Sequence, residues 1–153
     1  MESSAVTREP GPARGRAYRR ILVGFDGSRE AQDALRTALA LGEEVEADVR
    51  VLLVVRPPAH VETPEELASA VAAERENLSR GLSRVLPSGA RPPVDTRVVI
   101  AEDPAQAIAE HAEQHGFDIV VVGSHGREHA MHRGTGRCLT ALVRSHPCPV
   151  LVV

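Results

Sequence analysis

A loop rich in glycine and arginine follows a strongly apolar segment near the end of the chain. Residues 119–139 read IVVVGSHGREHAMHRGTGRCL and hold four glycines, three arginines and three histidines. The β-branched run before Gly123 predicts a buried strand. Gly123 and Gly126 permit positive φ and close backbone approach, so the N–H groups after the strand can form a concave nest for an anion. We expect Gly136 to begin a helix, whose N-terminus adds unpaired donors and partial positive charge.

The charge of this loop favours phosphate as the anion. Between residues 124 and 137 it carries three arginines against one glutamate, a net charge of +2. The chain as a whole has a formal net charge of −3, and residues 1–20 contribute +3, so residues 21–153 carry −6. All eighteen basic residues are arginine. The absence of lysine excludes a P-loop or a Schiff-base mechanism.

No arrangement of residues predicts a catalytic or metal site. Ser124 and His125 follow the strand and Asp26 follows an earlier one, but adjacent side chains rarely aim at each other, and no Gly-x-Ser-x-Gly elbow exists. No lysine, metal carboxylate or positioned base is evident, so we expect at most slow hydrolysis of a bound phosphate compound. The loop histidines lack partners typical of a metal site, and His111 and His115 lack the zincin pattern. We expect these histidines to be solvated.

Apolar runs alternate with amphipathic segments along the chain. Strands are predicted at residues 21–25, 49–55, 94–100 and 118–122 and within the ending HPCPVLVV; helices are predicted at 29–45, 64–86, 104–115 and 135–145. This order predicts a single α/β domain with an open, parallel, five-stranded, Rossmann-like sheet and helices on both faces. We expect residues 1–17, which are rich in Pro, Gly and Arg, to form a disordered basic arm before a domain at 18–153.

Turn and capping residues place two of the polar segments at one edge of the sheet. Asp26-Gly27-Ser28 is a turn and helix-cap signal after the first strand, where Asp26 can simply form an Asx-turn. Asp103 is the predicted N-cap of the third helix, which starts at Pro104 and ends at Gly116. Ligands of open α/β sheets bind beyond the carboxyl ends of the strands, where the strand order reverses. Asp26 and the loop after Val122 are both expected there.

Four segments of the chain resemble the universal stress protein family over residues 19–153. They are ILVGFDGSREAQDAL, EDPAQAI, DIVVVGSHGR and HPCPVLVV. Members of the nucleotide-binding branch carry a Gly-x2-Gly-x9-Gly loop, which Gly123, Gly126 and Gly136 match. The resemblance implies a fold like that of the adenine nucleotide alpha hydrolases and a stress-response module that binds ATP. It further implies that Asp26 contacts the adenosine and that Val51 lies near the adenine.

Loop and resemblance together define a candidate nucleotide site. Its predicted members are Asp26, Val51, Gly123, Ser124, His125, Gly126, Arg127, Thr135, Gly136 and Arg137. The expected ligand is ATP, AMP or another adenine nucleotide, with Mg²⁺ accompanying ATP. Arg137 stands where the family has Ser or Thr, and Leu139 where a small or hydroxylic residue is common. Arg137 could pair with phosphate oxygens, or it could fill the phosphate space itself.

A second function class stays open, namely a nucleotide-free dimeric stress protein or adaptor. The apolar ending Pro149 to Val153 predicts an edge strand that pairs with a second copy, and family resemblance also implies a homodimer. The chain has two cysteines, no apolar signal segment and no long apolar run, so we expect a cytoplasmic protein without membrane contact. The chain has two Phe, one Tyr and no Trp, so few aromatic side chains can stack on nucleic-acid bases, and we expect no nucleic-acid partner.

Overall fold

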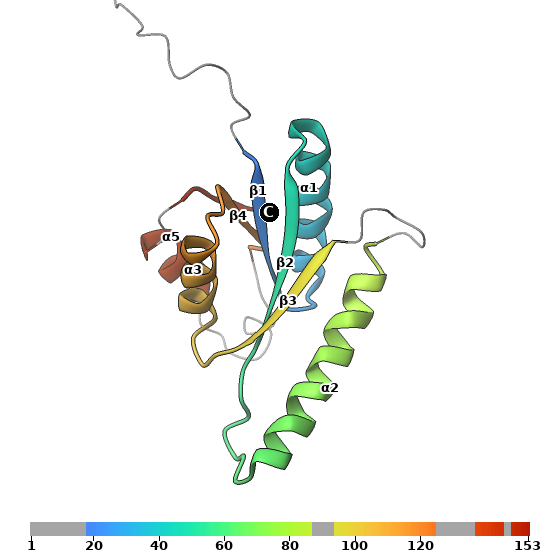
Figure 1. Ribbon diagram of the computed structural model, residues 1–153, viewed down its shortest axis with the longest axis vertical. Coiled ribbons are helices and arrows are strands. Elements are labelled where there is room, and N and C mark those ends of the chain that lie inside the picture. The colour runs from blue at the N-terminus through green and yellow to red at the C-terminus, as the bar shows by residue number, and fades with distance from the viewer. Residues whose placement is uncertain (1–17, 87–93, 125–136, 146–147) are drawn as a thin grey trace, which may run out of the picture.

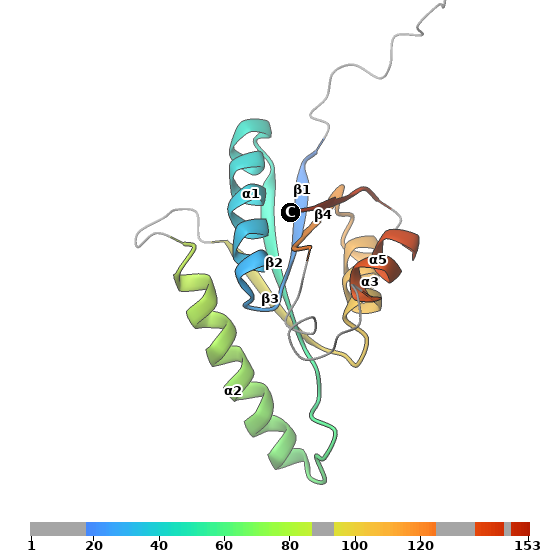
Figure 2. The ribbon, with the colours of Figure 1, turned by 180° about the vertical axis from the view of Figure 1, so that it is seen from behind.

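The computed structural model describes residues 18–86, 94–124, 137–145 and 148–153, and they form a parallel sheet with helices on both faces. The strands are β1 (Arg20–Phe25), β2 (Asp48–Val55), β3 (Asp95–Ile100), β4 (Ile119–Val122) and β5 (Val150–Val152). The helices are α1 (Arg29–Val45), α2 (Pro64–Ser83), α3 (Pro104–Gln114) and α5 (Arg137–Ser145). Helices α1 and α2 cover one face, and α3 and α5 cover the other (Figures 1 and 2). The predicted fold class is confirmed.

The strand order is β3-β2-β1-β4-β5, and every neighbouring pair is parallel. From β1 the chain moves outward through β2 to β3 and then crosses to the other side of β1 to form β4. The order therefore reverses between β1 and β4, which is where open α/β sheets bind ligands. In Figure 1 the carboxyl ends of the strands point downward, and the first half of α2 extends past them.

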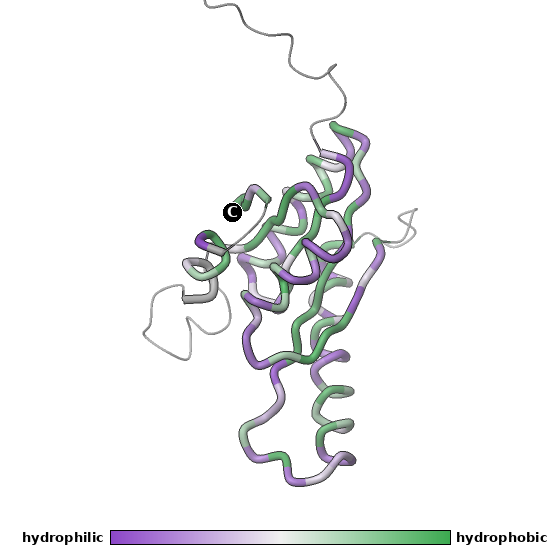
Figure 3. Tube along the Cα trace, turned by 60° about the vertical axis from the view of Figure 1, so that its left-hand side comes forward, coloured by the Kyte–Doolittle hydropathy of each residue, from purple (hydrophilic) through white to green (hydrophobic). Residues whose placement is uncertain are grey.

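Alternate residues of the strands form two apolar cores, one on each face of the sheet. On the face of α1 and α2, Ile21 and Val23 of β1 are fully buried. On the face of α3 and α5, Leu22 and Val120 are fully buried, and Leu142 of α5 covers them at 1% exposure. Hydrophobic residues accordingly concentrate along the strands in Figure 3. A sheet buried on both faces explains why its strands read as continuous apolar runs.

Helix α1 packs against the sheet through a stripe of small residues. Ala31, Ala34, Leu35 and Ala38 are buried, Gly42 continues the stripe, and the partly buried Leu41 packs against the same core. A Cβ on Gly42 would lie 2.8 Å from Val49 Cγ2, so only glycine lets the last turn approach β2 this closely. Small residues along this stripe bring α1 close to the sheet.

The helix ends follow local capping chemistry. Asp103 caps α3 by accepting a hydrogen bond from the Gln106 N–H at 3.1 Å, as predicted, and Gly116 follows the helix with a φ of 63°. Helix α2 starts with a capping box, in which the side chains of Thr63 and Glu66 each accept a hydrogen bond from the backbone N–H of the other residue. It ends at Ser83 rather than near residue 86, because the next two N–H groups bond to the carbonyls of Gly81 and Leu82, three residues back, in a tighter turn.

Candidate functional site

The switch point between β1 and β4 brings together two predicted site residues almost a hundred positions apart in sequence. Val23 of β1 is in register with Val121 of β4. Continued by three residues, this register places Asp26 level with Ser124. Both residues are partly buried at the carboxyl edge of the sheet. The structure therefore confirms that the segments after β1 and β4 share one edge.

Asp26 organises the turn between β1 and α1. Its Oδ1 accepts a hydrogen bond from the Ser28 N–H at 2.9 Å, which is the Asx-turn expected from the sequence. Gly27 between them has a φ of 82°, a conformation that favours glycine. Ser28 in turn caps α1, accepting from the Ala31 N–H at 3.1 Å. This turn fixes the Asp26 carboxyl group beside the N-terminus of α1.

Gly123 is required by helix packing. A Cβ at this position would lie 2.7 Å from the carbonyl carbon of Glu30 and 3.0 Å from the Ala31 nitrogen. The end of β4 thus lies against the first turn of α1, whereas the close approach expected from the sequence was to an anion. The expectation of positive φ is wrong here, since among the described residues only Gly27, Gly116 and Glu46 have it. The close approach is made to α1 within the protein itself.

The backbone after Gly123 differs from the predicted anion nest in one respect. The Ser124 N–H donates to the Val153 carbonyl at 2.8 Å, and the Val153 N–H donates to the Val122 carbonyl at 3.0 Å. These bonds extend the β4–β5 ladder past the end of both strands. The first N–H after Gly123 is therefore committed to the C-terminal residue. Any nest for an anion has to begin later in the loop.

Val51 lies deeper in the sheet than the resemblance implies. It pairs with Val23 and is fully buried in the core between the sheet and α1. Phe25 pairs with Leu53, so continuation of the register places Val54 level with Asp26. The structure therefore does not bring the Val51 side chain to the edge that carries Asp26 and Ser124. The end of β2 at this edge consists of Val54 and Val55.

The remaining predicted site residues belong to the loop and the start of α5. His125, Gly126, Arg127, Thr135 and Gly136 lie outside the described residues. Arg137 is the first described residue of α5.

Two glycines at the carboxyl edge are not among the predicted site residues. A Cβ on Gly24 would lie 2.9 Å from Ile108 Cδ1, so α3 packs directly over the end of β1. A Cβ on Gly81 would lie 3.3 Å from the Phe25 ring and 3.5 Å from Gly27 Cα, so α2 packs over the β1–α1 turn. The sequence signal for Gly24 is a glycine interrupting an apolar strand, which indicates close approach by another segment.

The histidine pair of α3 differs from its predicted environment. His115 is exposed, as predicted, and its ring centroid lies 4.3 Å from that of His111. His111 is partly buried, and its Nε2 is inaccessible to solvent without a hydrogen-bond partner in the described structure. The expectation that both histidines are solvated is therefore wrong for His111, because α3 turns it toward the sheet and Phe117. No group of three metal-ligating side chains occurs among the described residues.

Strand β5 lies at one edge of the sheet, as predicted for the C-terminal segment. It pairs with β4 alone among the described strands, and Val152 is 40% exposed. Within the described ranges, none of the helices combines the length and hydrophobicity needed to cross a bilayer.

The sheet order, the switch point and the capped helix α1 define an open α/β domain with helices on both faces of a parallel sheet. The sequence profile of the Universal stress protein family matches residues 17–153. The chain belongs to this family. The universal stress protein YxiE of Bacillus subtilis is 28% identical over 147 residues, covering 89% of this chain and 99% of YxiE.

Solved structures of the family have the same fold. The universal stress protein UspA from Lactobacillus plantarum superimposes with a TM-score of 0.72 at 28% identity, covering 89% of this chain and 97% of UspA. The Archaeoglobus fulgidus universal stress protein in complex with dAMP has a TM-score of 0.62 at 20% identity, covering 89% and 98% of the two chains. A universal stress protein in complex with cAMP has a TM-score of 0.60 at 19% identity, covering 90% and 97%.

Proposed function

We propose that this chain binds an adenine nucleotide, in the first place ATP, at the carboxyl edge of the sheet between β1 and β4. The observation that carries the proposal is the meeting of Asp26 with the start of the glycine loop at the switch point, beside the N-terminus of α1. A carboxylate can accept hydrogen bonds from ribose hydroxyls, and a helix N-terminus favours negative charge. Binding is proposed to control the contacts of a stress-response module in the cytoplasm.

Two members of the same fold support the adenine part of this proposal, since their structures contain cAMP and dAMP. We propose a triphosphate rather than a monophosphate because of the loop that follows β4. Its net charge of +2 and its glycine spacing suit several phosphates. His125, Gly126, Arg127, Thr135 and Gly136 are the proposed phosphate contacts, together with Ser124.

The described edge refines how the nucleoside would lie. We assign the ribose to Asp26 and the base to the end of β2 near Val54, because Val54 is level with Asp26 and Val51 is buried. Mg²⁺ would accompany ATP through its phosphate oxygens, which is the usual mode for this ion. The chain contains no lysine to assist phosphate transfer, and the proposed role is binding.

A matched pair of variants tests the site. Asp26→Asn keeps the Oδ1 that accepts from Ser28 and so preserves the turn, but it removes the negative charge. Asp33→Asn removes an exposed carboxylate of α1 that pairs with Arg36. By calorimetric titration with ATP, AMP and adenosine, we expect Asp26→Asn to weaken all three about tenfold, the loss of one charged hydrogen bond, and Asp33→Asn to weaken none. Equal affinities in both variants would contradict the assignment of Asp26.

Mass spectrometry of the purified, denatured protein supplies an independent test of the ligand. We expect a co-purified adenine nucleotide, released in stoichiometric amount. If neither co-purified nucleotide nor titratable binding is found, the second candidate function takes precedence. That function is a nucleotide-free dimer or adaptor that pairs through β5, and the exposed edge position of Val152 supports it.

A further inference from the structure

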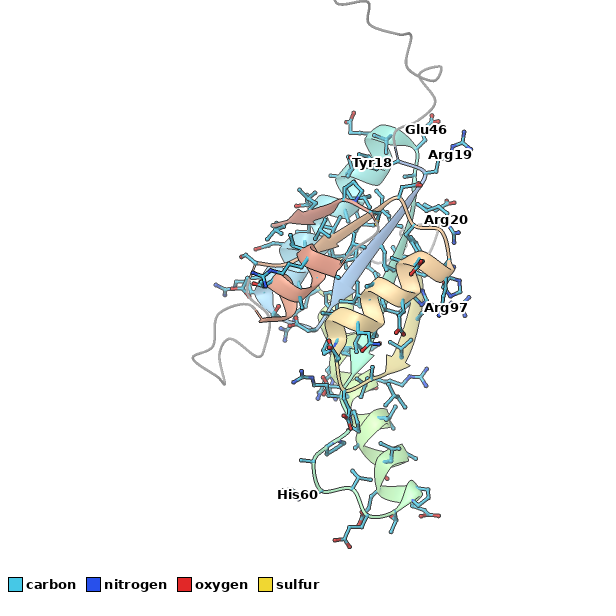
Figure 4. The ribbon with its side chains drawn as sticks, turned by 90° about the vertical axis from the view of Figure 1, so that its left-hand side faces the viewer. Tyr18, Arg19, Arg20, Glu46, His60 and Arg97 are labelled. Atoms are coloured by element: carbon cyan, nitrogen blue, oxygen red, sulfur yellow. The ribbon has the colours of Figure 1, made fainter. Side chains whose placement is uncertain are left out.

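The edge of the sheet opposite the proposed nucleotide site carries a second group of ionisable side chains. We call it the amino-edge cluster; it comprises Arg50 of β2, Asp95 and Arg97 of β3, and His111 and His115 at the end of α3. Arg50 is in register with Asp95, and Leu52 with Arg97, so the three charged residues lie on the α3 face of the sheet. Figure 4 shows Arg97 on the same side of the molecule as Arg20, beside the end of α3.

Asp95 holds the two arginines of the cluster together. Its Oδ2 lies 2.6 Å from Arg50 Nε, and its Oδ1 lies 3.5 Å from Arg97 Nε. Each guanidinium therefore meets the carboxylate through Nε and keeps its two terminal nitrogens for another acceptor. Within the described structure these terminal nitrogens donate no hydrogen bond. Arg50 is largely buried, with 18% of its side chain exposed, whereas Arg97 is 60% exposed.

Aromatic stacking brings His111 to the same place. Its ring stacks on Phe117 with centroids 5.9 Å apart, and the guanidinium carbon of Arg50 lies 5.3 Å from the Phe117 centroid. His111 Nε2 is buried and has no partner among the described residues. Buried polar atoms in native proteins are almost always hydrogen-bonded, so the His111 Nε2 is available to a further partner.

The charges around His111 are predominantly positive. Burial, His115, Arg50 and Arg97 lower the pKa of His111 to about 4, and only Asp95 among the described groups opposes them. Arg20 adds a further cation over Phe117, 4.7 Å from the ring centroid, but it is committed to the His115 carbonyl at the end of α3. The nearby Asp118 carboxylate accepts the N–H groups of Arg19 and Arg20.

A cation and an anion are the two ligands to weigh at this cluster. A histidine pair four residues apart on a helix can bind a transition metal, but two guanidinium groups beside it oppose a positive ion. The same guanidinium groups attract an oxyanion and can bind it through paired N–H donors. A neutral histidine with its proton on Nε2 supplies one more donor.

We propose that the amino-edge cluster is a second binding site, which takes a single oxyanion group, phosphate or carboxylate, between the terminal nitrogens of Arg50 and Arg97 and the Nε2 of His111. The site lies at the edge opposite the proposed nucleotide site and does not depend on it. Arg97 is its exposed entrance, and Arg50 and His111 are its partly buried donors. Asp95 positions the two arginines and is itself no contact of the anion.

The test uses NMR titration of the full-length protein with inorganic phosphate at pH 6.0 and constant ionic strength. We expect the ring Cε1–H resonances of His111 and His115 to shift along a saturable curve, with a dissociation constant of about 1 mM, typical of a single small anion. A bound anion stabilises the protonated ring, so the measured pKa of His111 should rise in its presence.

Arg97→Gln and Arg36→Gln form a matched pair, since each removes an exposed arginine that is paired with an aspartate. We expect Arg97→Gln to weaken phosphate about tenfold or more and Arg36→Gln to leave it unchanged. Thermal melting checks that both variants fold alike. Should Arg97→Gln fail to fold, His111→Phe, which retains the ring stacking, replaces it, and the same loss is expected.

Acetate and a phosphoserine peptide identify the source of the oxyanion group. Tighter binding of phosphate than of acetate assigns the site to phosphate, the reverse assigns it to carboxylate, and stronger binding of the peptide than of free phosphate indicates a protein-borne group. Small linear shifts that are equal in wild type and both variants would overturn the proposal. Saturable shifts with Zn²⁺ but with neither anion would overturn it as well, because they would assign the cluster to a metal.

Discussion

Lowering the pH should destabilise this protein partly through one histidine. His111 is wedged between the end of α3 and the sheet, where burial and the charges of His115, Arg50 and Arg97 lower its pKa from 6.5 to about 4. Between these two values the unfolded chain binds more protons at this site than the folded chain does. The free energy of unfolding therefore rises with pH in this window. The contribution is fully present above pH 6.5 and is lost as the pH falls through 4.

The size of the effect follows from the shift and from the position of the ring. A pKa change from 6.5 to about 4 contributes at most about 3.4 kcal/mol to the free energy of unfolding, because each pKa unit corresponds to about 1.36 kcal/mol. His111 is only partly buried, so solvent screening reduces this to about 1.5 kcal/mol. Most of it, about 1 kcal/mol, should be lost between pH 7 and pH 4.5.

Urea unfolding of the wild type and of His111→Phe measures this loss. The phenylalanine keeps a ring against Phe117 but cannot take up a proton, so the difference between the two proteins cancels the carboxylates that titrate in both. The comparison is made at pH 7 and pH 4.5 in piperazine buffer of fixed ionic strength, which supplies no oxyanion to the amino-edge cluster. If both proteins lose the same free energy of unfolding, the buried histidine is not the cause.

Three further changes test other parts of the structure. Gly123→Ala should lower the free energy of unfolding by about 1–3 kcal/mol in urea, because its Cβ meets the α1 backbone. Gly24→Ala meets side-chain atoms only, of Ile108 and Val122, and should cost less; equal losses would argue against the α1 contact. If the Arg137 guanidinium pairs with phosphate, Arg137→Ala should weaken the binding of ATP more than that of adenosine, by about 1.5–3 kcal/mol in calorimetry. If Arg137 instead blocks the site, Arg137→Ser should strengthen the binding of ATP. Unchanged affinities in both variants would show that Arg137 is not part of the site. Light scattering should show that the full-length protein is a dimer and that deletion of residues 150–153 makes it monomeric. A full-length monomer at high micromolar concentration would refute pairing through β5. A dimer that survives the deletion would place the interface elsewhere.

The first turn of α1 links the proposed nucleotide site to the rest of the fold. Ser28 caps the helix, Asp26 holds the turn, and the end of β4 touches Glu30 and Ala31. Ser124 is tied in turn to the C-terminal Val153 beyond β5. The glycine loop therefore starts from a segment fixed on one side by α1 and on the other by the edge strand. A change at the β5 edge would reach the start of the loop through the hydrogen bonds that Val153 makes with Val122 and Ser124.

Local signals in the sequence predicted the elements and several of their ends. The apolar runs of the strands follow from burial on both faces, and the stripe of Ala31, Ala34 and Ala38 follows from the helical period, so both are visible without tertiary information. Asp103 and Pro104 mark the start of α3 because capping depends on neighbouring backbone groups alone. The meeting of the β1 and β4 ends follows from topology rules for alternating strands and helices.

Only the tertiary structure decided properties that depend on contacts between distant segments. Gly123 needs to be glycine because α1 lies against it, and the Ser124 N–H is committed because the C-terminal Val153 lies beside it. Val51 is buried three residues before the position level with Asp26, and this depth follows from the register of two strands. His111 looks like a solvated helix residue in sequence, and it loses its water only because α3 turns it toward Phe117 and Arg50. Burial and pKa depend on what a fold brings next to a residue, and local sequence does not specify that neighbour.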